Sequence, residues 1–152
     1  FVKLIANSAA SITIKDKFTQ EKTDVEASSS ASISGDLEAN DLDISMDSSS
    51  SFNGKIWAVN LYVDASSAAS ISISGKSKNA DMSSSSGSSI NGKDVIVENL
   101  KADSSSGASL EVSASSTVDA EASSGGSLNV YKKGNVTTVK KEESSGGSVT
   151  IQ

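Results

Sequence analysis

Along most of the chain, large apolar side chains lie two residues apart, with polar residues between and beside them. Leu61 and Val63 form one such pair, and Ile71 and Ile73 form another. Successive side chains of a β-strand point to opposite faces, so this spacing is typical of strands. A helix would need apolar spacings of three and four residues. The pattern predicts an all-β chain made of short strands.

One five-residue motif returns along the whole chain: serine, two small residues, serine, and then a large apolar residue. The apolar residues that end successive copies lie 18 to 21 positions apart. The eight copies are Ser8–Ile12, Ser29–Ile33, Ser48–Phe52, Ser67–Ile71, Ser86–Ile90, Ser106–Leu110, Ser124–Leu128 and Ser145–Val149. A period of about 20 residues that spans a chain indicates a solenoid, in which each repeat buries its apolar face against its neighbours.

Alignment of the copies on their last residue, here called the anchor, reveals further columns of like residues. Apolar residues dominate the columns ten and eight positions before the anchor, at the anchor, and two positions after it. These columns are expected to point inward, so Leu61, Val63, Ile71 and Ile73 should be buried together. Acidic residues occupy the columns between them and are expected to face water.

Each repeat therefore reads as a strand, a tight corner of Ser, Gly and Ala, a second short strand and a looser return. Small residues suit the corner because they tolerate positive φ. Parallel strand connections are overwhelmingly right-handed. The predicted fold is all-β: a single-stranded right-handed parallel β-helix with about eight rungs of roughly 20 residues.

The returns between repeats are less regular than the strands. Lys15–Asp24 is charged and mixed, and it is expected to be a loop that leaves the first rung. Asp36–Asp41, Asn53–Ala58 and Lys76–Asn79 are expected to be shorter returns, and Lys132–Asn135 a polar turn.

The length of 152 residues suits one domain, so residues 1–152 are expected to form a single β-helix. The chain opens at Phe1 without a methionine, and we expect it to be part of a longer secreted precursor. No segment approaches the roughly 20 apolar residues of a membrane span. The first and last strands carry no polar cap, which predicts a partner, a larger parent protein or a homo-oligomer at the open rod ends.

Composition excludes several classes of function. The net charge is −6, and all the basic residues are lysines, which argues against nucleic acid as a partner. Cysteine and histidine are absent, so no disulfide framework or thiolate metal site is expected, and no cofactor is predicted. The few aromatic residues are too scattered for a stacking platform: Phe1, Phe18, Phe52, Trp57, Tyr62 and Tyr131.

The later corners resemble those of a bacterial family, the auto-transporter adhesin head GIN domain, whose hallmark is a repeated Ser-Gly-Ala-Ser-Ser-apolar corner. The matching corners are Ser86-Gly87-Ser88-Ser89-Ile90, Ser106-Gly107-Ala108-Ser109-Leu110, Ser124-Gly125-Gly126-Ser127-Leu128 and Ser145-Gly146-Gly147-Ser148-Val149. The closing passage Tyr131–Asn135, followed by Val136–Lys141, also looks like the end of the family. The first four corners depart by using Ala or Ser where the family often has Gly.

The resemblance implies a right-handed β-helix, similar in shape to pectin lyases, on a secreted or envelope-attached bacterial protein. It also implies an adhesin role and no known catalytic residues. Because fold does not fix function, the residues must be weighed on their own chemistry.

Nucleophilic serine chemistry has no support in the sequence. Without histidine there is no Ser-His-Asp arrangement, and no serine stands three residues before a lysine. Paired carboxylates are the stronger alternative, because Asp64, Asp103 and Glu121 occupy adjacent or alternate rungs and could span the roughly 5–10 Å that glycosidases use. Lyase sites of this shape usually need a basic residue such as arginine, which is absent. Calcium between stacked acids is a further alternative to a solvated acidic surface.

A ladder of hydroxyl groups is the third candidate, because serine precedes every anchor. A regular face of this kind could bind an ordered ligand surface, or it could merely satisfy the corner. The candidate ligand residues are Asp64, Asp103, Glu121, Ser70, Ser89, Ser109 and Ser127.

The sequence predicts a non-enzymatic cell-surface or secreted adhesin module, in the bacterial envelope or outside it. The module would bind a surface glycan or protein through a repetitive face. The alternative is a carbohydrate-active enzyme of pectin-lyase shape that acts on polysaccharide.

Overall fold

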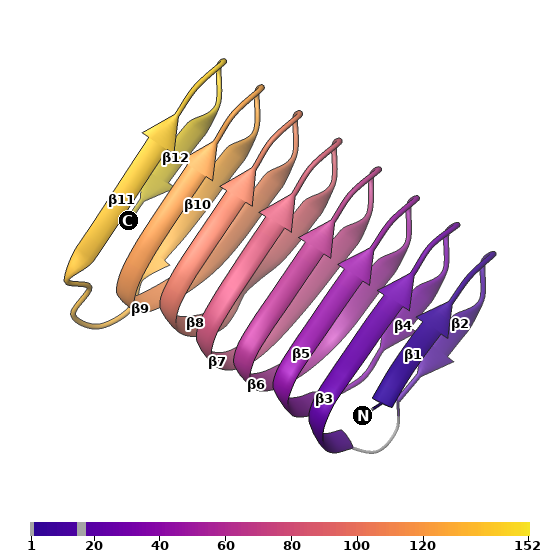
Figure 1. Ribbon diagram of the computed structural model, residues 1–152. Helices are drawn as coiled ribbons and strands as arrows, with labels where there is room; N and C mark the ends of the chain where they lie inside the picture. Colours follow the sequence, from indigo (N-terminus) through magenta and orange to yellow (C-terminus); the bar gives the residue numbers. More distant parts are fainter. Residues whose placement is uncertain (1, 15–17) are drawn as a thin grey trace.

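The computed structural model describes residues 2–14 and 18–152, which form an all-β solenoid of about eight turns (Figure 1). Its strands are β1 (Val2–Ala6), β2 (Ser11–Thr13), β3 (Phe18–Ala27), β4 (Ser32–Ser34), β5 (Leu37–Met46), β6 (Ser51–Ala65), β7 (Ser70–Ser84), β8 (Ser89–Ser104), β9 (Ser109–Ala122), β10 (Ser127–Lys132), β11 (Thr138–Glu143) and β12 (Ser148–Ile151). All the described strand pairs are parallel. No helix in the described part of the chain is long and apolar enough to cross a membrane.

Neighbouring rungs pair in the register that the repeat predicts. Leu61 of β6 lies opposite Leu42 of β5 on one side and Ala80 of β7 on the other. The anchors stack in the same way, with Ile71 between Phe52 and Ile90. The prediction of a parallel β-solenoid with in-register repeats is confirmed.

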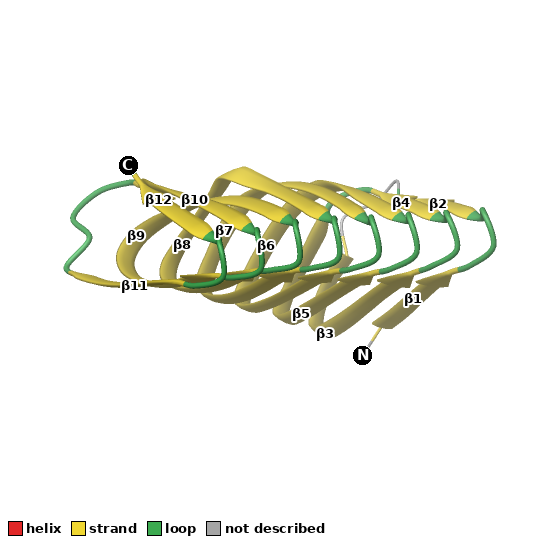
Figure 2. Ribbon diagram, turned by 90° about the horizontal axis from the view of Figure 1, so that it is seen from above, coloured by secondary structure: helices red, strands yellow, loops and turns green. Residues whose placement is uncertain are grey.

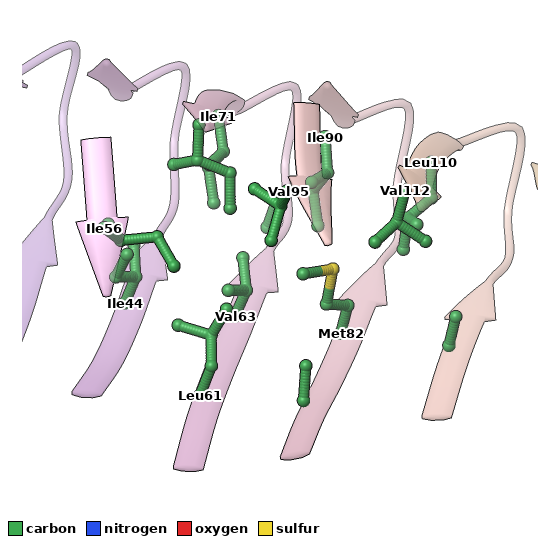
Figure 3. Packing of buried hydrophobic residues seen from close by; sticks show 14 of the residues in the cluster. Ile44, Ile56, Leu61, Val63, Ile71, Met82, Ile90, Val95, Leu110 and Val112 are labelled. Atoms are coloured by element: carbon green, nitrogen blue, oxygen red, sulfur yellow. The ribbon is translucent and has the colours of Figure 1, made fainter. Parts of the chain in front are cut away.

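The predicted inward columns form the core. Leu61, Val63, Ile71 and Ile73 are all buried, and the column neighbours drawn in Figure 3 pack around them. The last rung departs from the prediction, because Val139 is 47% exposed and Lys141 is also exposed. Both belong to β11, which within the described residues pairs only with β9, so no later rung covers their side chains.

The corners are β-turns with two successive left-handed residues. In the fourth corner, Ser67 has φ 51° and Ala68 has φ 67°, and the Ala69 N–H donates to the Ser66 carbonyl at 3.1 Å. Two central residues with positive φ define a type I′ turn. The Ala68 N–H also donates to the carbonyl of Ser86 in the next corner at 3.1 Å, and Figure 2 shows the corner loops in a row. The expected small, positive-φ corner is confirmed.

The prediction of loose returns was wrong for most of the segments, because these segments are strand. The strand segments are Phe18–Asp24 in β3, residues 37–41 in β5, Asn53–Ala58 in β6 and Lys76–Asn79 in β7, whereas Lys15–Lys17 lie outside the described residues. The neighbouring rungs supply backbone partners along these segments, so a strand forms there without local apolar alternation. The polar turn expected at Lys132–Asn135 begins just after β10 ends at Lys132.

Opposite the corners, the strands β5 to β9 curve round from one face of the solenoid to the other, at the lower edge in Figure 1. We call this side, formed by residues 36–38, 55–59, 75–78, 94–98 and 113–116, the bend edge. Gly75 has φ 126°, and a Cβ there would lie 1.8 Å from the Ile56 carbonyl oxygen, so the curve of β7 requires glycine.

Candidate ligand-binding faces

The seven candidate residues fall on two separate faces of the solenoid. One face, here called the acidic face, carries the outward side chains of the strands that lead into the corners. The other, the serine face, carries the outward side chains of the strands that leave the corners. Figure 2 shows these two sets of strands as separate layers joined by the corner loops. Both layers pack on a common core, so their exposed side chains point away from each other. The structure therefore brings acids together with acids and serines with serines, but not the two sets.

The four candidate serines form one column on the serine face. Ser89 lies opposite Ser70 on one side and Ser109 on the other, and Ser127 follows Ser109. Rungs of a parallel sheet lie about 4.8 Å apart, so the hydroxyls repeat at this interval. Ser70, Ser89 and Ser109 are exposed, and Ser127 is half-buried.

The adjacent outward column of the serine face is almost uncharged: Ser34, Asn53, Ser72, Asn91, Glu111 and Asn129. In the described part of the chain, the hydroxyls of the four candidate serines have no hydrogen-bond partner. Buried serines take over the bonding of the corner instead, as Ser88 Oγ shows by donating to the carbonyl of Ala65 at 2.7 Å. The exposed ladder is thus not needed to satisfy the corner.

On the acidic face, Asp64, Asp103 and Glu121 are exposed and share one column, with Ser83 between the two aspartates. Partial burial, with a smaller effect of the Asp47 charge, raises the pKa of Asp64. No group of three or more acidic, histidine or cysteine side chains placed to hold a metal ion occurs among residues 2–14 and 18–152. Calcium between stacked acids therefore gains no support from the geometry.

Two further carboxylates show how position sets acidity. Burial, followed by the charges of Asp24 and Glu26, raises the pKa of Asp43. The opposite holds at the corner residue Asp47, whose pKa is lowered by hydrogen bonds from the hydroxyls of Ser67 and Ser66. The Ser66 hydroxyl lies 3.1 Å from the Asp47 carboxylate.

A side-chain amide ladder, which the sequence interpretation missed, runs between the acidic face and the bend edge. Asn60 Nδ2 donates to Asp41 at 2.8 Å, Asn79 Nδ2 donates to Asn60 at 3.1 Å, and Asn99 Nδ2 donates to Asn79 at 2.9 Å. Thr117 Oγ1 closes the ladder by donating to Asn99 at 2.9 Å. The sequence signal for this ladder was the recurrence of asparagine at the repeat spacing, since Asn60, Asn79 and Asn99 lie 19 and 20 residues apart. These amides bond to one another, so the ladder is structural.

The bend edge holds two open hollows that share Trp57, Lys76 and Ile96. One has a volume of about 490 Å³ and is lined by Trp57, Ala58, Val59, Lys76, Ser77, Lys78, Ile96, Glu98 and Ser115. The other has a volume of about 660 Å³ and is lined by Asp36, Glu38, Lys55, Ile56, Trp57, Gly75, Lys76, Asp94 and Ile96. The sequence interpretation treated the aromatic residues as scattered and did not single out this part of the surface. The signal was a lone tryptophan in a column shared with Glu38 and Lys76.

Comparison with known proteins adds family and fold. No curated protein matches this sequence. A crystal structure described as a putative adhesin from Parabacteroides distasonis is similar over 98% of this chain, with a TM-score of 0.83 and 18% sequence identity. This chain covers 64% of that protein, and at this identity the likeness bears on fold alone.

The sequence itself gives the family. A family profile matches residues 32–134, from the second corner to the turn that follows β10. The matched region contains the serine ladder, the acidic column and the bend edge. The chain therefore belongs to the family described as putative auto-transporter adhesin, head GIN domain.

Proposed function

We propose that this domain is a non-enzymatic adhesin module, secreted or displayed on the surface of a bacterium, that binds a glycan or protein through its serine face. The observation that carries the proposal is the column of Ser70, Ser89 and Ser109, whose exposed hydroxyls are not engaged by other described groups. A hydroxyl both donates and accepts, so the column offers a ligand the same pair of interactions at every rung.

Repetition explains how such weak contacts could support adhesion. A single exposed hydroxyl contributes little, because water competes for its hydrogen bonds. Several identical contacts on one rigid face raise the effective concentration of each and can multiply modest affinities. Affinity is then expected to fall gradually as rungs are altered. The family supports an adhesin role of this kind.

The enzyme alternative gains nothing from the geometry. Asp64 and Asp103 lie two rungs apart, about 9.6 Å along the rod, on a strand face rather than in a cleft. Neither residue lines a hollow of the bend edge. The chain also lacks the histidine and arginine that would move a proton or stabilise a developing negative charge.

The proposal includes self-association through the rod ends. Within the described residues, β1 pairs only with β3 and β11 only with β9, so each presents an unpaired edge. Unpaired strand edges are templates for pairing with another chain. Light scattering during size-exclusion chromatography would show a concentration-dependent mass if the ends associate, and a constant monomer mass would contradict this part.

Matched lysine substitutions test the serine face. Ser89→Lys changes the serine column, and Ser83→Lys changes a serine of the acidic column near the middle of the rod. Binding of the purified domain would be measured on arrays of glycans and of cell-surface proteins. We expect Ser89→Lys to weaken binding, Ser83→Lys to leave it nearly unchanged, and Ser89→Lys with Ser109→Lys to weaken it further. Equal losses from Ser83→Lys and Ser89→Lys, or no binding to either array, would contradict the proposal.

A further inference from the structure

The bend edge is where the repeat is most strongly broken. The column that contains Trp57 reads Glu38, Trp57, Lys76 and Ile96 on successive rungs, with no shared chemistry. The register between β8 and β9 also shifts between Gly92 and Ile96, so the intervening residues of β8 lie opposite no residue of β9 in the strand pairing. Bulges re-aim side chains and are over-represented beside functional sites. The bend edge therefore has a local geometry that does not repeat, whereas the strands on the two faces repeat from rung to rung.

Trp57 is the centre of this geometry. Its side chain is 45% exposed, although tryptophan is the largest apolar residue and is highly buried on average. The two hollows adjoin it, and both extend to Ile96, which lies two rungs away with Lys76 between. The hollows lie on either side of the column of Trp57, Lys76 and Ile96, which lines both of them. We call the two hollows together the groove; it is open, unlike an enclosed pocket for an apolar anchor.

We propose that this groove is a binding site for a neutral oligosaccharide, with one sugar ring stacked on the exposed indole of Trp57. A pyranose ring presents C–H groups on its faces and hydroxyls around its rim. An aromatic surface suits the faces, and charged side chains that donate or accept hydrogen bonds suit the rim. The groove supplies both, because the exposed Lys76, Asp94 and Glu98 lie around Trp57 and Ile96.

The charge of the groove selects a neutral ligand. Its lining interleaves the lysines Lys55, Lys76 and Lys78 with the carboxylates Asp36, Glu38, Asp94 and Glu98. A strongly anionic or cationic chain would meet like charges along the groove, which disfavours its binding. A peptide anchor usually needs a desolvated pocket, which an open groove with a charged rim does not provide. The site lies on the bend edge and is distinct from the serine face.

Trp57 is the one tryptophan of the chain, so its fluorescence reports directly on the site. The probes are cellotetraose, mannotetraose, xylotetraose, maltotetraose and the tetramer of N-acetylglucosamine, with tetragalacturonate as an anionic comparison. We expect at least one neutral probe to shift or quench the emission in a saturable way, and tetragalacturonate to have a much smaller effect. No saturable change with any neutral probe, or a response to tetragalacturonate alone, would overturn the proposal.

Variants then separate stacking from general effects, with calorimetry as the readout. Trp57→Ala is expected to weaken the best probe at least about tenfold, and Trp57→Phe to retain part of the affinity. Tyr62→Ala is the matched control, because Tyr62 is the other strongly exposed aromatic of β6 and lies on the acidic face. Unchanged affinity in Trp57→Ala, or an equal loss in Tyr62→Ala with both variants folded by circular dichroism, would refute the site.

The same variants keep the two proposals apart. Ser89→Lys should leave tetrasaccharide binding unchanged, and Trp57→Ala should leave unchanged those array signals that Ser89→Lys weakens. If only the tetrasaccharide result fails, the groove is not a glycan site and the serine face still stands as proposed. If only the array result fails, the serine face is not the binding face, and the groove remains as proposed.

Discussion

The side-chain amide of Asn79 donates a hydrogen bond to the side-chain oxygen of Asn60 on the neighbouring rung, at 3.1 Å. Asn79 in turn accepts a bond from Asn99 at 2.9 Å, so it is bonded on both sides. Such a ladder works only when like side chains stand in register. It therefore ties the register of β6, β7 and β8 to side-chain chemistry as well as to the apolar core.

Replacing the middle member of this ladder should cost stability. Asn79→Ala removes two side-chain bonds and leaves the amide of Asn99 without its acceptor, so we expect a loss of about 1–2 kcal/mol in the free energy of unfolding. Chemical denaturation would measure it. Asn40→Ala is the control, because Asn40 is exposed and lies outside the ladder. Equal midpoints for the two variants would show that the ladder adds nothing.

The core contains one hydroxyl that should be a liability. Thr23 is fully buried in the column of Leu42 and Leu61, and among the described groups its Oγ1 has no hydrogen-bond partner. Thr23→Val replaces this hydroxyl with a methyl group of similar size, so we expect a gain of about 1 kcal/mol in stability. Thr117→Val is the contrast, because Thr117 donates to Asn99 and should lose stability. Destabilisation by Thr23→Val would indicate an unrecognised partner for that hydroxyl.

Corner residues offer a test of backbone strain. Ala68 has φ 67°, so Ala68→Gly should relieve a left-handed conformation and stabilise the fold by about 0.5–1 kcal/mol. Gly107 occupies the equivalent position two corners later along the rod, at φ 74°, and a Cβ there would meet nothing within 4 Å. Gly107→Ala should therefore destabilise through φ alone. Thermal unfolding of both variants checks this, and shifts in the same direction would contradict the strain argument.

Stability should depend on pH in opposite ways at two aspartates. The pKa of Asp43 is raised above its ordinary value of 3.8, so the folded state binds its proton more tightly than the unfolded state. The contribution of Asp43 to the stability of the fold is therefore favourable at low pH and is lost as pH rises through the raised pKa. Asp43→Asn should then raise the melting temperature at neutral pH, and the gain should shrink below pH 3.8.

Asp47 is the opposing control. The pKa of Asp47 lies below 3.8, so the contribution of Asp47 to the stability of the fold is present above pH 3.8 and is lost as pH falls through the lowered pKa. Asp47→Asn should lower the melting temperature at neutral pH and matter little in acid. Parallel pH profiles for the Asp43 and Asp47 variants would show that their environments do not differ as described.

The sequence predicted the core because each inward position recurs in every repeat, and the repeats stack in register. Leu61 and Ile71 could be assigned inward since each belongs to a column of apolar residues, and their burial is confirmed. The strand at Asn53–Ala58 could not be predicted, because it carries glycine and charge without alternation and takes its hydrogen bonds from neighbouring rungs. Trp57 was missed for the opposite reason: its significance comes from differing from its column, and repeat alignment discards such differences.

The sequence also did not predict that the candidate residues would divide between two faces. Ser70 and Asp64 are only six positions apart, and both were correctly expected to point outward. Their separation depends on the reversal of the chain at Ser67 and Ala68, where two left-handed residues turn the strand back over the core. Column analysis identifies which residues point out, whereas the geometry of the turn decides in which direction.

The last prediction is that the domain turns over no polysaccharide. Catalysis needs a few groups held in one productive geometry, whereas Asp64, Asp103 and Glu121 repeat one exposed position along a strand face. The raised pKa of Asp64 has an ordinary cause, partial burial together with the nearby charge of Asp47, and the chain has no histidine or arginine. Assays of reducing ends and of unsaturated products on polygalacturonate, xylan and mannan, from acid to neutral pH, should show no saturable cleavage. Cleavage that Asp64→Asn or Asp103→Asn abolishes, while Asp119→Asn leaves it intact, would instead establish an enzyme on the acidic face.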